Sequence, residues 1–272
     1  MTKAGFRLLL VLAAFFAADA GWTHSDMDKP LYVATAGVDE GRCQDPANPC
    51  RTLAYALNRV GKGGQVRVAG GTYQLSDAAA IFQVISGITD IRGGFAADNQ
   101  FLAPAGLPTL ITGMPYQYRA QVQSLGFHLV ADQKGTNSNT LKETRAMLKQ
   151  NQALQAGLPA AACIGGSVSG LSCQNTDLLA HVPFSAVSGN PGAAADIWGF
   201  VDLNTNREYA LVSYNNGTAV FDVTDPTEPA EIGFVAGQNT VWRDIKVYQY
   251  FDETDQRWHA FAYVTADGTS EG

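Results

Sequence analysis

The fold is decided by the stretch Ala210-Leu211-Val212-Ser213-Tyr214-Asn215-Asn216-Gly217-Thr218-Ala219-Val220-Phe221-Asp222-Val223. Two β-rich runs flank an Asn-Gly step, which is among the strongest short-range hairpin signals because both residues tolerate a positive φ. Residues 224–229 follow and hold two prolines, which cannot continue a central strand. Residues 230–235 are rich in apolar residues and predict the next strand, so this part of the chain is expected to be an antiparallel sheet.

A second copy of this pattern begins about 50 residues further along the chain. Phe261-Ala262-Tyr263-Val264, followed by Ala266-Asp267-Gly268-Thr269, mirrors residues 210–212 followed by residues 215–218. A period of ~40–50 residues with several strands per unit is typical of propeller blades. Two unrelated hairpins are the alternative interpretation.

The first half of the chain has shorter apolar runs separated by glycine turns. Residues 31–35 alternate like a strand, and residues 51–60 have the apolar spacing of a short helix. Further strands are predicted over residues 65–69, 72–75, 81–85 and 88–91. Short strands with glycine turns suggest stacked β-coils or a small barrel.

A connector is expected over residues 114–162. Residues 127–130 could form one more strand. Thr140 and Glu143 have the spacing of a capping box, which predicts a helix that ends at Gly157. We expect this helix to pack on one of the β-segments.

The N-terminus has the three-part pattern of a secretory signal peptide. Lys3 and Arg7 precede an apolar run and the small-residue site Ala18-Asp19-Ala20. The apolar run of about ten residues is too short for a membrane span, which needs ~20. Residues 1–20 are therefore expected to be cleaved during export.

The four cysteines form two sequence-local pairs and agree with export. Cys43, Cys50, Cys163 and Cys173 allow three connectivities, and loop-closure entropy favours the two short loops. A zinc site is the rival, but the spacings are wrong for zinc knuckles and no His pair lies nearby. We expect the disulfides Cys43–Cys50 and Cys163–Cys173, which form in an oxidising compartment.

The charge balance excludes two classes of partner. The chain has 18 basic and 25 acidic residues. Removal of Lys3, Arg7 and Asp19 with the signal peptide leaves 16 and 24, a net charge of −8. An acidic chain without a Lys/Arg cluster is a poor candidate for binding nucleic acid or an anionic membrane.

One stretch of the first half resembles the opening of right-handed parallel β-helix proteins. It comprises Tyr32-Val33-Ala34-Thr35-Ala36-Gly37, Pro49-Cys50-Arg51-Thr52-Leu53-Ala54-Tyr55-Ala56-Leu57 and Val66-Arg67-Val68-Ala69-Gly70-Gly71-Thr72-Tyr73. The resemblance implies a helix that caps the first coil. Many such proteins are polysaccharide lyases or hydrolases, but only one or two coils fit before Pro115.

The second half is similar to the choice-of-anchor B family. The similarity lies in Cys173-Gln174-Asn175-Thr176-Asp177-Leu178, Ala195-Asp196-Ile197-Trp198-Gly199-Phe200 and Thr240-Val241-Trp242-Arg243-Asp244-Ile245-Lys246-Val247-Tyr248, and in Phe221-Asp222-Val223-Thr224-Asp225-Pro226, which resembles its LVIVD repeat. The resemblance implies a β-propeller-like ectodomain held at the cell surface by a variable C-terminal anchor. It implies no enzymatic activity and no cofactor. The chain ends within a blade, so we expect a C-terminally truncated chain that lacks this anchor.

Four residues are candidates for a binding surface: Trp198, Trp242, Arg243 and Asp244. Propeller loops can present aromatic and arginine side chains to a partner, although core packing of both tryptophans is the alternative. A carbohydrate-active β-helix would instead need a carboxylate and a second charged group on adjacent coils. Its only candidates are Asp77, Asp90, Arg92 and Asp98.

No metal site is predicted. Asp202-x-Asn204-x-Asn206 mimics a calcium loop, but Arg207 stands where glycine is needed, so a polar hairpin turn is favoured. The serine-containing stretch 166–170 is no nucleophile elbow, because its central residue is Val168. The histidines His24, His128, His181 and His259 show no ligand spacing.

The sequence thus predicts a mainly β protein with four segments. These are a signal peptide (1–20), a partial parallel β-helix-like segment (31–113), a connector with one helix (114–162) and incomplete β-propeller-like repeats (163–272). We expect a secreted binding or scaffold protein of the bacterial cell surface, without catalysis, whose partner is an extracellular protein or glycan. A carbohydrate-active β-helix protein and a non-functional fragment of a larger surface protein are the alternatives.

Overall fold

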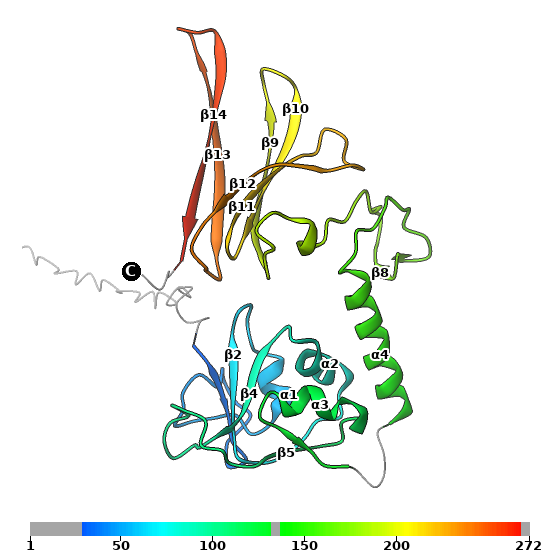
Figure 1. Cartoon of the computed structure of the whole chain (residues 1–272), viewed down its shortest axis with the longest axis vertical. Helices are drawn as coiled ribbons and strands as arrows, with labels where there is room; N and C mark the ends of the chain where they lie inside the picture. The colour runs from blue at the N-terminus through cyan, green and yellow to red at the C-terminus, as the bar shows by residue number, and fades with distance from the viewer. Residues whose placement is uncertain (1–28, 132–136, 268–272) are drawn as a thin grey trace, which may run out of the picture.

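The computed structural model describes residues 29–131 and 137–267, and the predicted signal peptide lies outside these ranges. The chain is mainly β, as predicted, with its described strands distributed over five small sheets. Figure 1 shows residues 29–131 as a lower body and residues 194–267 as an upper body, with helix α4 (Ser138–Ala153) at one side between them.

Two parallel three-stranded sheets build the lower body, which is called the first body from here on. The strand order of one is β1 (Leu31–Val33), β2 (Gln65–Ala69) and β4 (Asp90–Phe95), and that of the other is β3 (Gly71–Gln74), β5 (Thr109–Thr112) and β6 (His128–Leu129). Leu31 lies opposite Val66, and Val66 lies opposite Ile91. All three are at most 3% exposed, so stacked strands place like residues in one core column.

The second parallel sheet closes the same core. Tyr73, Ile111 and Leu129 lie opposite one another on β3, β5 and β6, and all three are buried. The Tyr73 hydroxyl donates to the Ala69 carbonyl, and burial raises its pKa to about 12. The buried Tyr73 hydroxyl is therefore hydrogen-bonded within the core between the two sheets, as a dry interior requires.

Two helices cover this core, and one of them corrects a prediction. Helix α1 (Leu53–Leu57) lies in the predicted helical segment, with Thr52 as its N-cap. Residues 81–85 were expected to be a strand, but they belong to helix α2 (Ala78–Ser86). Asp77 accepts from the Ala80 amide at its start, and Gly87 ends it with φ 75°. The prediction was wrong because these two caps outweigh the β-branched run.

The connector contains short elements and one long helix. The 3-10 turn η2 (Tyr116–Tyr118) leads into α3 (Arg119–Gln123), and α4 packs against α2. The predicted capping box does not start α4, because Asn137 is the N-cap. Thr140 lies within the first turn, where its hydroxyl donates to the Ser76 carbonyl at 3.2 Å. The predicted connector helix is therefore present, but it begins earlier and ends at Ala153.

Both predicted disulfides are confirmed. The Cα atoms of Cys43 and Cys50 are 5.2 Å apart, and those of Cys163 and Cys173 are 6.0 Å apart. The first pair is buried in the core, whereas the second closes a loop around the small hairpin of β7 (Ser167–Val168) and β8 (Leu171–Ser172). These bonds indicate an oxidising compartment.

The upper body is built from antiparallel strands. After the 3-10 turn η3 (Phe184–Ala186), a four-stranded sheet has the order β12 (Ala230–Ala236), β11 (Gly217–Asp222), β10 (Arg207–Tyr214) and β9 (Ala194–Asp202). The predicted hairpin over residues 210–223 is confirmed, with Tyr214 opposite Gly217. Val187, Tyr214, Ala219 and Phe221 form its core.

The turn of that hairpin works differently from the prediction. None of Asn215, Asn216 and Gly217 has a positive φ. The Asn215 side chain instead accepts from the amides of Gly192 and Ala193, at 2.9 and 3.2 Å. Residue 217 has to be glycine because there is no room for a side chain: an added Cβ would lie 2.4 Å from Phe234 Cζ. Side-chain capping and close packing therefore determine this turn, rather than left-handed backbone.

A second hairpin repeats the geometry of the one formed by β9 and β10, which is called the first hairpin from here on. Strands β13 (Arg243–Asp252) and β14 (Arg257–Ala266) form a sheet of their own beside β9. Asp252 pairs with Arg257, as Asp202 pairs with Arg207 fifty residues earlier. The turn residues Asn206 and Gln256 have nearly equal φ values of 58° and 55°. The two hairpins thus share one register from their turns to Val212 and Ala262. The predicted repeat compared residues 210–212 and 215–218 with residues 261–264 and 266–269; Gly268 and Thr269 lie outside the described residues, so it stays a prediction.

The two bodies meet at the loop that precedes β2. The Lys62 ammonium donates to the Ala194 carbonyl and lies 4.9 Å from the centroid of the Trp242 ring. Burial at this contact lowers the pKa of Lys62. An added Cβ at Gly63 would lie 2.8 Å from Val241, so the backbones approach closely here.

Candidate binding surface on the second hairpin

The four binding residues predicted from the sequence have different environments. Arg243 is 8% exposed, and its guanidinium donates to the carbonyls of Tyr214 and Gln238. Trp242 lies under Lys62 at the contact between the two bodies. Trp198 is half-buried under the Lys246 ammonium, 4.6 Å from its ring centroid, and Asp244 is exposed. Arg243 is therefore buried, Trp198 and Trp242 are partly exposed beside lysines, and Asp244 faces solvent.

An aromatic surface does form nearby, on one face of the β13–β14 hairpin. Tyr248 lies opposite Phe261, and Tyr250 lies opposite His259. The rings of Tyr250 and Phe261 are 4° from parallel with centroids 6.1 Å apart, and Tyr248 stacks on Tyr250 at the same distance. Tyr263 continues the face along β14. We call these five residues the aromatic face.

The aromatic face is accessible to solvent. Tyr248, Phe261 and Tyr263 are 57%, 47% and 61% exposed. Contiguous exposed apolar patches of this kind mark interaction sites more often than scattered single residues do. These residues were not predicted from the sequence, although aromatic residues two positions apart on both arms, 248 with 250 and 261 with 263, have the period of one strand face.

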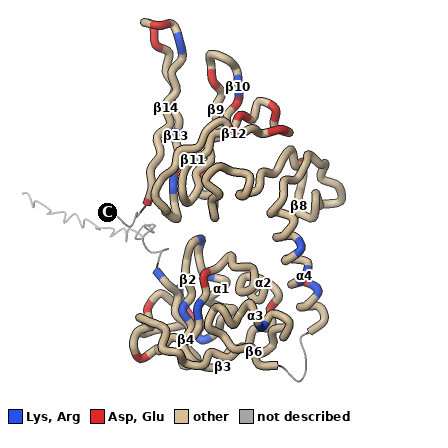
Figure 2. Tube along the Cα trace, viewed as in Figure 1, with Lys and Arg blue, Asp and Glu red and all other residues tan. Residues whose placement is uncertain are grey.

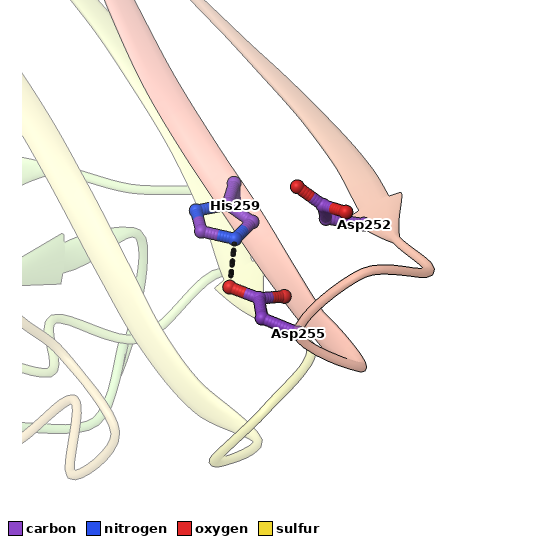
Figure 3. A group of neighbouring side chains, drawn as sticks. All are labelled: Asp252, Asp255 and His259. Atoms are coloured by element: carbon purple, nitrogen blue, oxygen red, sulfur yellow. Dashed lines mark hydrogen bonds and ion pairs between the residues drawn. The ribbon is translucent and has the colours of Figure 1, made fainter.

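A polar cluster borders the aromatic face at the tip of the hairpin. Figure 3 shows Asp252, Asp255 and His259, with the His259 Nε2 atom 2.8 Å from an Asp255 carboxylate oxygen. The structure thus brings His259 close to acidic side chains, which its sequence spacing did not predict. Among the described residues these three are the group able to hold a metal ion, with ligand atoms within 4.8 Å of one another.

Turn formation accounts for this cluster without a metal. The Asp252 carboxylate accepts from the Thr254 amide, and this bond, followed by that of the Thr254 hydroxyl, lowers the pKa of Asp252. The first hairpin has Asp202, Thr205 and Tyr209 at the equivalent positions. Because that turn has the same register with a single carboxylate, the second turn needs no ion to fold.

The calcium-like motif of the first hairpin is a polar turn, as predicted. The Asp202 carboxylate accepts from the Thr205 hydroxyl at 2.6 Å and from the Asn204 amide at 3.0 Å, and these bonds lower the pKa of Asp202. Figure 2 shows that acidic residues, coloured red, lie at the turns of the upper body. Asn204 points from this turn to β14, where its carboxamide bonds both the N–H and the C=O of Trp258.

The four carboxylate and arginine candidates of the first body do not converge. Asp77 caps α2, and Asp98 lies in the turn after β4. Asp90 and Arg92 form an ion pair of 2.9 Å, but they lie on the same strand. Gln65 on the neighbouring strand donates to Asp90 at 2.7 Å. Arg67, which donates to Gln65, extends this polar row across two strands and was not among the predicted residues.

No helix among the described residues has both the length and the apolar character that a membrane span requires. Comparison of the chain with family models, with curated proteins and with solved structures finds no match.

Proposed function

We propose that this chain is a secreted binding module of the bacterial cell surface, which contacts an extracellular glycan or protein through the aromatic face. In this proposal the upper body is part of a β-propeller-like ectodomain of the choice-of-anchor B type. The first body is the opening of a parallel β-helix, and the chain itself has no catalytic activity.

The aromatic face is the observation that carries the proposal. Tyr248, Tyr250 and Phe261 stack in one row, so their rings are held in place by the hairpin before a ligand arrives. Aromatic side chains that are ordered in advance lose little conformational entropy on binding and are enriched among interface hot spots. The polar cluster at the tip would add hydrogen-bonding groups beside the apolar rings.

Four further features support export and a modular β-architecture. The disulfides fit an oxidising compartment, and the apolar run of the N-terminus has the composition of a signal peptide. Hairpins in one register, fifty residues apart, fit a protein that repeats one β-unit. Parallel strands with stacked core columns fit β-helical coils in the first body.

A glycan and protein array probed with the purified, disulfide-intact chain tests this function. Tyr248→Ser and Phe261→Ser should each weaken binding about tenfold, because loss of one central aromatic anchor costs more than about 1 kcal/mol. Leu102→Ser is the matched control, since Leu102 is 75% exposed on the first body. Equal binding by all three variants would contradict a role for the aromatic face.

The carbohydrate-active alternative rests on the row formed by Arg67, Gln65, Asp90 and Arg92. These side chains share the outer side of two adjacent parallel strands. A reducing-end or unsaturated-product assay on acidic polysaccharides tests it. Activity that disappears in Asp90→Asn would favour this alternative over a module without catalysis.

A further inference from the structure

A polar pocket of about 250 Å³ lies in the first body, away from the aromatic face. We call it the Arg51 pocket, and it is lined by Thr35, Arg51, Thr52, Thr72, Tyr73 and Gln74. Pockets for drug-sized ligands have volumes of about 300–1,000 Å³, so this one has room for a small ligand or for one unit of a polymer.

The Arg51 side chain is held at one end and open at the other. Its Nε donates to the Gly37 carbonyl at 2.9 Å. Asp39 does not occupy the guanidinium, because its carboxylate accepts from the Arg51 amide and from the amide and hydroxyl of Thr52. Within residues 29–131 and 137–267, no acceptor bonds the two terminal nitrogens of Arg51. A guanidinium fixed in this way presents a planar pair of donors that matches a carboxylate.

Backbone amides of β3 point to the same side of the first body. The Gly71 and Leu75 amides donate toward β5, at 2.9 and 2.8 Å. The backbone groups of successive strand residues point to opposite sides, so the Thr72 and Gln74 amides point away from β5. The chain segment after β1 lies on that side, because β1 and β4 pair with opposite edges of β2. This segment supplies Thr35 to the pocket.

The remaining lining suits a ligand that is rich in hydroxyl groups. The Thr35 and Thr72 hydroxyls and the Gln74 carboxamide can each donate and accept, and all three residues are exposed. In the described structure none of these three side chains forms a hydrogen bond. Tyr73 is only 3% exposed, so an apolar ligand would find little apolar surface here. Sugars carry hydroxyl groups of this dual character.

The charge of the first body favours an acidic ligand. Residues 29–131 have 8 basic and 6 acidic side chains, a net charge of +2, whereas residues 137–267 have 7 and 14, a net charge of −7. An anion is therefore attracted to the first body and repelled by the rest of the described chain.

We infer that the Arg51 pocket binds one carboxylate-bearing sugar unit of an acidic glycan. The sugar carboxylate accepts from the terminal nitrogens of Arg51. The sugar hydroxyls bond the Thr35 and Thr72 hydroxyls, the Gln74 carboxamide and the two free amides of β3. This site does not depend on a ligand of the aromatic face, so either proposal can fail without the other.

A nuclear magnetic resonance titration of the disulfide-intact full chain tests the site. Glucuronic acid is the probe, and glucose is the neutral control. Glucuronic acid should bind with a Kd of about 1 mM, as expected for so small a ligand, and should shift the Thr72 and Gln74 amide signals. The Gly71 and Leu75 amides are internal controls that should move less, because they donate toward β5.

Three substitutions separate this pocket from the other candidate surfaces. Arg51→Gln should weaken glucuronic acid binding at least about tenfold, because it removes the charge and the paired donors. Thr72→Val keeps the shape of an exposed side chain and should weaken binding about threefold through loss of one hydroxyl. Arg92→Gln is the matched control, since Arg92 lies on β4 in a different sheet. Tyr248→Ser on the aromatic face should leave this binding unchanged.

Four outcomes would overturn the inference. The first is no shift of the Thr72 and Gln74 amides at about 10 mM glucuronic acid, tenfold above the expected Kd. The second is an equal response to glucose, which would exclude recognition of the carboxylate. The third is the same response to sodium sulfate at equal concentration, which would make the pocket a simple anion site. The fourth is binding that Arg92→Gln removes and Arg51→Gln does not, which would place the sugar on the row at Asp90.

Discussion

Gly217 lies directly beneath the ring of Phe234, so that a Cβ added at residue 217 would stand 2.4 Å from the Phe234 Cζ atom. The two residues belong to neighbouring strands, β11 and β12, and Gly217 directly follows the turn between β10 and β11. The ring also limits Gly189, whose added Cβ would stand 2.6 Å from the same atom. The Phe234 ring therefore contacts two backbone segments closely, which is possible only because residues 189 and 217 have no side chain.

Gly217→Ala should therefore destabilise the upper body. Overpacking a well-packed site costs about 1–3 kcal/mol, because the ring or the backbone has to shift. Urea denaturation of the full chain, followed by far-UV circular dichroism, measures the change. Gly233→Ala is the control, since no atom lies within 4 Å of its added Cβ. A loss of stability that is equal in both variants would contradict a role for the Phe234 contact, because the smaller entropy of the unfolded chain with Ala would by itself stabilise the fold.

The two disulfides should contribute differently to stability. Replacing Cys43 and Cys50 by Ala should lower the free energy of unfolding by about 2–3 kcal/mol from loop entropy alone, and further because both sites are buried. The same change at Cys163 and Cys173 should leave the main thermal transition in place, because that loop encloses only β7 and β8. Differential scanning calorimetry checks both variants. A larger loss from the second pair would contradict this assignment.

Acid should destabilise the upper body, in part through Asp222. The Thr224 hydroxyl and amide, and then Arg207, lower the pKa of the Asp222 carboxyl. A group whose pKa is lower in the folded state adds stability above its unfolded pKa of about 3.9, and this stability is lost as pH falls through the folded value. Asp222→Asn should therefore flatten the dependence of stability on pH below about pH 4.

Thr224→Val separates the causes of this effect. It removes the hydroxyl hydrogen bond but leaves the ion pair with Arg207, so the acid transition should shift to higher pH than in the unmodified chain. Urea unfolding midpoints measured from neutral to acidic pH give the result. If Asp222→Asn has the same acid dependence as the unmodified chain, other carboxylates dominate the acid transition.

The contact between the two bodies should depend on Lys62. Lys62→Ala removes the cation above the Trp242 ring, a contact worth about 0.5–1 kcal/mol, and the bond to the Ala194 carbonyl. Amide hydrogen exchange should therefore accelerate around Trp242 and around residue 194. Lys149→Ala on the exposed face of α4 is the control. Unchanged exchange in Lys62→Ala would show that the two bodies are held together by other contacts.

Much of the local structure could be predicted from residue patterns. The hairpin over residues 210–223 follows from β-rich runs that flank a turn, and the disulfides follow from short sequence separations. The prediction failed for residues 81–85, where a β-branched run lies in α2 because Asp77 and Gly87 cap it. It also placed the start of α4 at the wrong residue, since Thr140 bonds to Ser76, a residue distant in sequence.

The candidate site was harder to predict than the strands. Tyr248 and Phe261 are separated by thirteen positions and become neighbours only through the register of β13 with β14. Arg243, by contrast, has the residue type of a binding hot spot, but tertiary contacts bury its guanidinium among carbonyl groups. Residue type indicates what a side chain can do, whereas packing decides whether it faces a partner.

The amino-acid sequence by itself determined the β-rich class, the paired cysteines and the hairpin over residues 210–223. Each of these depends on residues close together along the chain or on a simple period. Only the tertiary structure decided that Asn204 bonds Trp258 and that the aromatic face is exposed. These features depend on which strands become neighbours, and burial and hydrogen bonding between distant residues select those neighbours.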